Sequence, residues 1–307
     1  MRLRFALGII VTTLTCACSA AYAGAATPSP KADKEKSSQQ LEITADESLE
    51  YYAPKRLYVA RKNAKAVRGN LTVTADVLTA HEREKAKGAK QPKTTTGDKS
   101  DAGDIDIMTA EGNVVIVDPR QRITGEHAVY DLDKHKMIVT GDNLRYETAK
   151  ETVTAKDSLE YYEDTKLAVA RGHAVADQSN RHIEGDVLTA EFRDAPNGQS
   201  QLTRMTSQGH VTVITKSNTE SKFGKTKGNA SGEDVSRGDH AVYNANSNVA
   251  VLTGNVKITR KDGTELSGDV GEVDFNKNEN RLMNDGSGRV RALLPPKATE
   301  NKGLKTQ

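Results

Sequence analysis

The chain has 307 residues, a formal net charge of +2, no Trp and only 4% aromatic residues. A buried core must therefore be built mainly from Val, Ile, Leu and Ala. The near-neutral charge argues against nucleic acid as the main partner, because domains that bind nucleic acid usually carry a strong positive excess.

The first residues have the layout of a secretory signal peptide. Arg2 and Arg4 are followed by an apolar run over residues 5–14, and Ala21-Tyr22-Ala23 then fits the small-x-small rule for cleavage. We therefore expect residues 1–23 to be a cleaved signal peptide and the mature protein to be periplasmic.

Two alternatives to cleavage stay open. The first is an uncleaved anchor, although the apolar run is about half of the roughly twenty residues that span a bilayer. The second is lipidation at Cys18, against which Thr15 stands where an aliphatic residue is expected. Cleavage would remove Cys16 and Cys18, which leaves no thiol for a disulfide, a metal cluster or a nucleophile. Removing Arg2 and Arg4 would also lower the net charge from +2 to about zero.

The rest of the chain contains a duplication. Residues 43–83 and 153–193 align without a gap at an offset of 110 residues, and 20 of the 41 positions are identical. The copies continue, because GEHAVYDLDKHKMIVTGDNL from Gly125 corresponds to GDHAVYNANSNVAVLTGNVKI from Gly238. A duplication of this kind predicts a repeat architecture.

Each copy is built from a shorter unit. This unit occurs about seven times in the whole chain. The unit opens with an aliphatic residue, a spacer, a small residue and usually an acid, and it closes on Gly followed by a polar residue. The acids at this position are Asp46, Asp76, Glu126, Asp186, Asp239 and Asp269. Between opening and closing lies a polar turn, such as residues 131–134 or 244–247.

Apolar residues alternate within these units, as in the pairs Val211 and Val213 or Val256 and Ile258. A period of two predicts strands with one buried and one wet face, and no stretch shows a sustained helical stripe. The recurring glycines suit tight turns or bulges. We therefore predict an all-β protein of about fourteen short antiparallel strands in two facing sheets.

The boundaries follow from composition. We expect a single repeat domain over residues 41–294, with tandem copies at about 43–150 and 153–292. Residues rich in Ala, Pro, Lys and Ser are expected to form a disordered leader at 24–40 and a disordered tail at 295–307. Lysine-rich polar loops are expected at 84–104 and 217–233, either simply solvated or touching anionic head groups.

The units that begin at Gly125 and Gly238 resemble the OstA-like repeat of the LptA family of lipopolysaccharide-export proteins. The resemblance covers roughly residues 41–292, and the inserted loops depart from the compact family pattern. It implies an elongated, slightly twisted antiparallel β-jellyroll that holds the acyl chains of lipopolysaccharide (lipid A) between its sheets, without a cofactor. The implied partners are an inner-membrane LptC-like protein, an outer-membrane LptD-like translocon and further copies joined head to tail.

Strand parity suggests which residues would line such a trough. Assuming that the larger apolar residues of each alternating pattern face inward, the candidates are Val139, Leu167, Val169, Val211, Val213, Val249 and Val251. Their neighbours, such as Ala168 and Ala250, would then face outward.

The first and last strands, expected near residues 41–45 and 289–293, are the edges of the stack. Unpaired backbone groups there could accept a strand from a partner. The candidate assembly residues are Leu41, Ile43, Val290 and Ala292. The alternative is that charged and flanking residues merely protect these edges.

A catalytic or metal centre is not indicated by the sequence. The seven histidines lack metal-ligand spacing. The regularly spaced acids suit hydrogen bonding at turns better than the paired carboxylates of glycoside hydrolysis. We therefore expect a carrier without enzymatic activity, metal or cofactor. The alternatives are a structural or interaction protein of the envelope, an anchored LptC-like partner, and a polysaccharide-cleaving enzyme on a β-solenoid.

Overall fold

The computed structural model describes residues 41–83, 105–195, 200–216, 233–277, 279–286 and 288–295. The expected signal peptide and leader, the loop 84–104, the tail beyond residue 295 and all but Glu233 of the loop 217–233 lie outside the described residues.

The described part consists of eighteen strands and contains no helix. The strands are β1 Glu42–Thr44, β2 Ser48–Tyr52, β3 Leu57–Arg68, β4 Leu71–Glu82, β5 Ile105–Asp118, β6 Gln121–Asp131, β7 Lys136–Thr140, β8 Leu144–Thr148, β9 Glu151–Ala155, β10 Ser158–Tyr162, β11 Leu167–Gln178, β12 Arg181–Asp194, β13 Ser200–Lys216, β14 Glu233–Asn244, β15 Val249–Thr259, β16 Glu265–Asp274, β17 Glu279–Met283 and β18 Arg291–Leu293.

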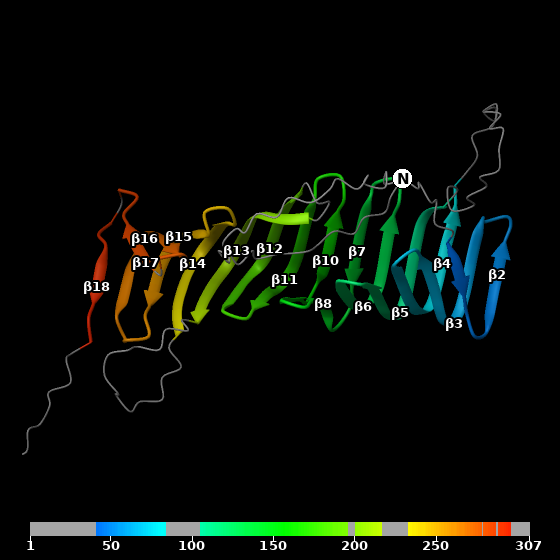
Figure 1. Ribbon diagram of the computed structural model, residues 1–307, viewed down its shortest axis with the longest axis horizontal. Helices are drawn as coiled ribbons and strands as arrows, with labels where there is room; N and C mark the ends of the chain where they lie inside the picture. Colours follow the sequence, from blue (N-terminus) through cyan, green and yellow to red (C-terminus); the bar gives the residue numbers. More distant parts are fainter. Residues whose placement is uncertain are drawn as a thin grey trace, which may run out of the picture.

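The strands pair antiparallel with their neighbours, and they follow one another along the long axis from β2 at one end to β18 at the other (Figure 1). The prediction of an all-β antiparallel fold is confirmed. The predicted lengths are wrong, because most strands are long, up to the 17 residues of β13. The polar turns at residues 131–134 and 244–247 are confirmed, since the chain reverses there between β6 and β7 and between β14 and β15.

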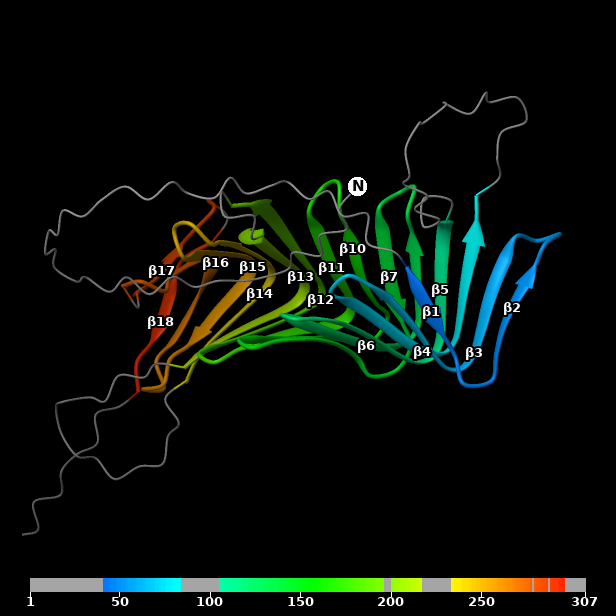
Figure 2. The same ribbon diagram turned by 45° about the vertical axis from the view of Figure 1, so that its right-hand side comes forward.

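The long strands do not end at the recurring Gly-polar pairs but pass through them. The cross-strand register shifts in the middle of each long strand, for example between Glu111 and Val114 and between Gln208 and Val211. Elsewhere the strand breaks at the same level, as between β7 and β8 or β9 and β10. These irregularities lie on one line, the crease, along which the sheet folds into two facing halves (Figure 2). We call the half that contains β2, β7, β10 and β17 sheet I, and the half that contains β1, β8, β9 and β18 sheet II.

In alternate long strands, β3, β5, β11, β13 and β15, two successive residues with positive φ lie at the crease. Gly209 and His210 have φ of 72° and 48°, and Gly254 and Asn255 have φ of 75° and 50°. Gly adopts this left-handed conformation without steric cost, and Asn is among the residues that tolerate it best. The prediction that the glycines mark turns or bulges is therefore confirmed: Gly112, Gly172, Gly209 and Gly254 lie at bulges inside strands, whereas Gly141 lies between β7 and β8.

The acids of the repeat hold these bulges from the neighbouring strand. Asn113 Nδ2 donates to Asp76 Oδ2 at 2.9 Å, and Asn255 Nδ2 donates to Asp239 Oδ2 at 2.8 Å. Asp186 makes the same contact with His210 Nδ1 at 2.9 Å. The acids thus hydrogen-bond across strands to a bulge residue 16 to 37 positions away, and not within turns as the sequence predicted. Each of these carboxylates stabilises the polar residue that must stay left-handed.

The small residue before each acid lies on the inner side of the crease, where the two sheets converge. A Cβ added to Gly125 would lie 2.6 Å from Val139 Cγ1 and 3.0 Å from Leu144 Cδ2. Val139 belongs to sheet I and Leu144 to sheet II, so a larger residue at position 125 would push the sheets apart. The motif of aliphatic, spacer, small and acidic residue therefore describes one corner: the aliphatic and small residues point inward, and the acid points outward.

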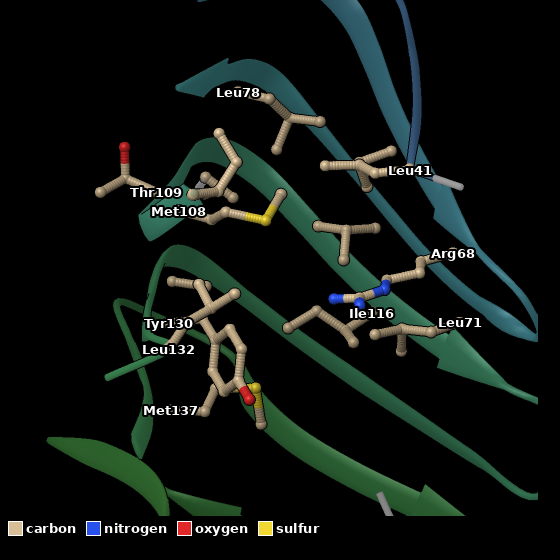
Figure 3. Close-up of a pocket in the computed structure, with 15 residues that line it drawn as sticks. Leu41, Arg68, Leu71, Leu78, Met108, Thr109, Ile116, Tyr130, Leu132 and Met137 are labelled. Carbon is tan, nitrogen blue, oxygen red and sulfur yellow. The ribbon is translucent and has the colours of Figure 1, made fainter. Parts of the chain in front are cut away.

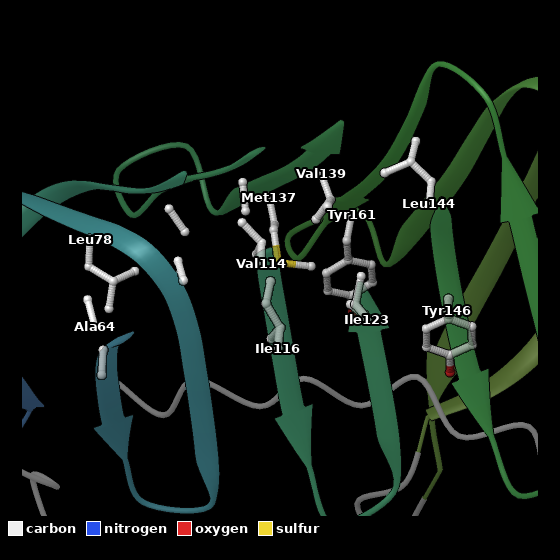
Figure 4. Packing of buried hydrophobic residues seen from close by; sticks show 14 of the residues in the cluster. Ala64, Leu78, Val114, Ile116, Ile123, Met137, Val139, Leu144, Tyr146 and Tyr161 are labelled. Carbon is white, nitrogen blue, oxygen red and sulfur yellow. The ribbon is translucent and has the colours of Figure 1, made fainter. Parts of the chain in front are cut away.

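The core lies between the two sheets (Figure 4). Cross-strand register joins its members into continuous rows that run from strand to strand. One row of sheet I consists of Tyr58, Ala80, Met108, Tyr130, Met137, Tyr161, Ala168, Ala190, Met205, Tyr243, Ala250 and Val273. The facing row of sheet II consists of Ile43, Ala66, Val73, Ile116, Ile123, Tyr146, Val153, Ala176, Ile183, Val213, Ser236, Ile258 and Leu266.

Substituting Gly209 by Ala should destabilise the fold by about 1–3 kcal/mol, because the residue must keep φ positive and its Cβ would overlap the Asp186 carboxylate. Gly263→Ala is the control, since Gly263 has φ of 83° but its Cβ would lie 3.8 Å from Pro295. Urea unfolding followed by circular dichroism gives both free energies. Equal losses in the two variants would mean that the bulge is not sterically held by its acid.

Candidate functional site

Two cavities open between the sheets along the same apolar rows. The first, of about 70 Å³, is lined from sheet I by Leu78, Met108, Tyr130 and Met137 and from sheet II by Arg68, Leu71, Val73 and Ile116 (Figure 3). Six of these eight side chains are aliphatic or thioether groups, and the other two are Tyr130 and Arg68. Most of the wall is therefore suited to hydrocarbon.

The second cavity, of about 90 Å³, lies where the two copies meet. Its apolar wall includes Tyr146, Val153, Leu159, Ala176, Leu188, Phe192 and Met205. Two polar side chains, Gln121 and Glu151, also line it and are buried. The carboxylate of Glu151 accepts a long hydrogen bond from Gln178 Nε2 at 3.4 Å. Burial raises the pKa of the Glu151 carboxyl to about 7, although Gln178 and the charge of Arg181 act in the opposite direction.

The rim of the groove, far from the crease, is closed in the C-terminal copy by Arg181. This residue begins β12 in sheet II, and its guanidinium carbon lies 4.6 Å from the ring centre of Tyr243 and 3.9 Å from that of Phe275. The guanidinium also donates to Asn248 Oδ1 at 3.2 Å. All three partners stand at the rim of sheet I, so Arg181 bridges the mouth of the groove through cation–π contacts.

Three of the seven predicted trough residues lie in the core between the sheets. Val139, Val211 and Val213 are 0%, 1% and 2% exposed and belong to the two hydrophobic clusters. Val139 lies in β7, and Val211 and Val213 lie in the part of β13 that belongs to sheet II. Whether they contact a lipid stays a prediction.

The predicted inward facing is corrected for Leu167, Val249 and Val251. All three are only half-buried and belong to neither core cluster, whereas Ala250 and Leu252 are buried members of the second cluster. Ala168, expected to face outward, instead packs against the first cluster and lines the second cavity.

Val169 differs from these three residues. It is 6% exposed and is among the residues around the second cavity, but it stands in register with Glu160 and Thr189 rather than with the inner row of Ala168.

The physical reason for this correction is that residues 167–170 and 249–252, LAVA and VAVL, are apolar at every position. Alternation cannot distinguish the faces of such a run. On the inner face Ala168 and Ala250 are in register with the larger Tyr161 and Tyr243, while Leu167, Val249 and Val251 occupy the other face. Only the register with neighbouring strands shows which parity is inside.

The predicted assembly residues lie at the two ends of the sheet. Ile43 in β1 pairs with Ala66, and Leu41, just before β1, packs against the first core cluster. Ala292 in β18 pairs with Leu266, while Val290 precedes β18 and is exposed. Within the described residues β1 and β2 pair only with β3, and β17 and β18 pair only with β16. The strands expected at residues 41–45 and 289–293 are thus found at the edges, each shorter than predicted.

Sequence reasoning missed Glu151 and Arg181. Neither belongs to the repeat motif. Both lie at the start of strands, where a charged residue is normally predicted to face solvent. The only available signal was that Arg181 aligns with Leu71 in the other copy, so that a charged residue replaces an apolar one at an inward position.

Bent antiparallel strands that enclose an apolar groove define an elongated β-jellyroll. The sequence profile described as "LptA/(LptD N-terminal domain) LPS transport protein" matches the chain twice, over residues 42–157 and 152–278. The chain belongs to this family of lipopolysaccharide-transport proteins, and the two matches correspond to the two tandem copies.

A further comparison is with the crystal structure of LptH, described as the LptA homologous periplasmic component of the conserved lipopolysaccharide transport device from Pseudomonas aeruginosa. The two chains are 21% identical, the alignment covers 48% of this chain and 95% of that one, and the TM-score is 0.37. No curated protein sequence matches the chain. Within the described residues, no helix has the length and apolar character needed to span a membrane.

Replacing Glu151 by Gln should remove a pH-dependent loss of stability. Since the folded pKa is raised to about 7, the folded state keeps the proton while the unfolded state releases it near its ordinary value. The wild-type free energy of unfolding should therefore fall as the pH rises from about 4.5 to 7 and level off above, by about 2–3 kcal/mol relative to Glu151→Gln. Urea unfolding at a series of pH values measures this. Glu147→Gln, at a partly exposed ion pair with Arg145, is the matched control, and the fall in stability assigned to Glu151 should persist in it.

Proposed function

We propose that this protein is a periplasmic carrier that receives lipopolysaccharide from an inner-membrane complex and passes it along the groove toward the outer membrane. The observation that supports this most directly is the pair of facing rows, which run from β3 to β16 across both copies and are apolar except at Ser236. An acyl chain exposed to water costs about 0.8 kcal/mol per CH₂, so a carrier must supply a continuous apolar path. Membership of a lipopolysaccharide-transport family agrees with this use of the groove.

Loading requires the sheets to move apart. The two cavities, at about 70 and 90 Å³, would each hold only a few water-sized groups. An acyl chain would enter by separating the facing rows, and its own apolar surface would then pack against both of them. Within the described residues, hydrogen-bonded ladders join the two sheets along the crease, while core packing and rim contacts such as Arg181 hold them together elsewhere. The side opposite the crease can therefore open without breaking the ladders.

The two ends of the molecule support assembly into a bridge. At the N-terminal end Leu49, Tyr51 and Tyr58 are exposed although they lie on the inner face of sheet I. At the C-terminal end the exposed apolar residues are Met283, Val290, Leu293 and Leu294. A strand of a second copy, or of an LptC-like or LptD-like protein, added at either edge would cover these residues and align the two grooves.

The alternative is a structural envelope protein, or an anchored LptC-like partner, that uses the same repeat as a scaffold. Exposed apolar ends would serve assembly in that case too. A scaffold would hold no lipid between its sheets, so lipid capture from the interior separates the two functions.

A photo-crosslinker placed at Met108 or Met205 should capture lipopolysaccharide in living cells, because both side chains line the cavities. The matched controls are Ile107 and Thr206, one residue away on the outer face, where a single step along the strand reverses the direction of the side chain. Capture at Met108 and Met205 should exceed that at the controls by about an order of magnitude. Equal labelling of both parities would reject the groove as the path of the lipid.

Leu49→Asp should weaken head-to-tail association, because it places a charge in the exposed apolar end that a partner strand would cover. We expect the dissociation constant for self-association to rise by about tenfold or more, measured by sedimentation velocity over a concentration series. Val129→Asp is the control, since Val129 is 41% exposed on the outer face of the central strands, compared with 56% for Leu49. Association that survives in folded Leu49→Asp would mean that the β2 edge does not form the joint.

A further inference from the structure

Each tandem copy places one arginine at the same point on the rim of sheet II. In the first copy the hairpin between β3 and β4 closes on the cross-strand pair of Arg68 and Leu71. In the second copy the equivalent hairpin closes on the pair of Gln178 and Arg181. At the offset of 110 residues Arg68 aligns with Gln178 and Leu71 with Arg181. The arginine therefore lies on the first strand of the hairpin in one copy and on the second strand in the other. In both copies it belongs to the same cross-strand pair.

Both arginines point into the groove. Arg68 is two residues beyond the buried Ala66 and lines the first cavity, where its guanidinium lies near Ile116 (Figure 3). Arg181 is two residues before the buried Ile183 and reaches the rings of Tyr243 and Phe275. Tyr130, the residue equivalent to Tyr243 in the first copy, lines the same cavity as Arg68. Each copy thus sets a guanidinium on one rim and a tyrosine on the other.

Neither guanidinium forms an ion pair within the described residues. Other arginines of the sheets do, since Arg171 Nε lies 2.9 Å from Glu160 Oε1 and Arg145 forms an ion pair with Glu147 at 2.6 Å. For Arg181 the polar partner is the neutral Asn248, and its buried Nε has no hydrogen-bond partner. A buried donor left without a partner calls for an explanation, and a cation without an ion pair even more so.

We propose that Arg68 and Arg181 are two equivalent recognition sites for the phosphate groups of an anionic amphiphile whose apolar chains occupy the groove. This rests on the proposed carrier function and identifies which part of the ligand is selected. An amphiphile with its chains between the sheets must hold its polar end at the mouth, where these two cations lie. The guanidinium offers a planar fork of donors that matches phosphate oxygens. Arg181 can release Asn248 to bind phosphate while one of its faces stays on an aromatic ring.

The proposal also explains how the rim of the second copy could open. The contacts of Arg181 with Tyr243, Phe275 and Asn248 hold sheet II to sheet I. A phosphate that takes the place of Asn248 supplies a stronger, charge-assisted hydrogen bond and loosens that closure when a ligand with the right head group is present.

The experiment uses full-length mature protein and two substitutions that exchange the residues of the two copies, Arg68→Gln and Arg181→Leu, singly and together. Because each new residue already stands at the aligned position of the other copy, the fold should tolerate both, and circular dichroism with thermal unfolding checks this. The control is Arg122→Gln, which removes the same charge from the outer face of sheet II next to the buried Ile123. The probes are diphosphorylated lipid A, its enzymatically dephosphorylated form, and inorganic phosphate alone.

The double variant should bind diphosphorylated lipid A on the order of a hundredfold more weakly than wild type, and each single variant about tenfold more weakly. Binding of dephosphorylated lipid A should be unchanged, and Arg122→Gln should behave as wild type. If the double variant fails to fold, Arg68→Lys and Arg181→Lys keep the charge and should lose less affinity than the single Gln and Leu variants.

Three results would count against the proposal in distinguishable ways. Wild-type protein that binds neither lipid would overturn the carrier function itself. Binding of both lipids with equal affinity in all variants would leave the carrier intact and overturn the role of the arginines. Tight binding of inorganic phosphate alone, lost in the arginine variants while lipid binding is retained, would show a free-anion site instead of a head-group site.

Discussion

The crease depends on pairs of left-handed residues that recur in alternate strands, in β3, β5, β11, β13 and β15, several of them held by a carboxylate of the neighbouring strand. Each pair shifts the register against the strand beside it, so both strands bend at the same level and the sheet closes on itself along its length. Without this closure an apolar sheet would have no second layer to bury it. The hydrogen bonds that Asn113 donates to Asp76 and Asn255 donates to Asp239 show the arrangement in both copies.

The crease in turn determines the size of the residues around it. Where the sheets converge, position 125 must be Gly, because Val139 and Leu144 from opposite sheets already fill the space. Away from the crease the rows contain larger residues, such as Met108, Met137 and Met205, whose flexible side chains can adapt to an irregular or changing space. The interior is therefore tight at the crease and adaptable toward the mouth, which suits a groove that must open for an amphiphile.

Charge is distributed according to the same geometry. Most ion pairs lie on the outer faces and the turns, where solvent screens them and each contributes little to stability. Three charged side chains instead face inward: Glu151, whose pKa burial raises, Arg68, which lines the first cavity, and Arg181, which lies over two aromatic rings. None of the three forms an ion pair within the described residues. A buried charge without an ion pair costs stability, so its retention in an otherwise apolar groove points to function.

The sequence by itself determined the class of fold and the periodicity of the chain, because alternation, recurrent glycines and the duplication are local patterns. It indicated that the recurrent acids form hydrogen bonds, but their partners lie across the strand pair at the bulges and not in turns, because only strand pairing brings the two positions together. Only the tertiary structure decided which face of β11 and β15 is inside, because LAVA and VAVL are apolar at every position. The register with the neighbouring strands shows which of the two faces points into the groove. The same holds for Arg68 and Arg181, which lie on different strands of their hairpins. Their common place on the rim exists only once the cross-strand pairs have formed, because sequence order alone does not bring the two positions together.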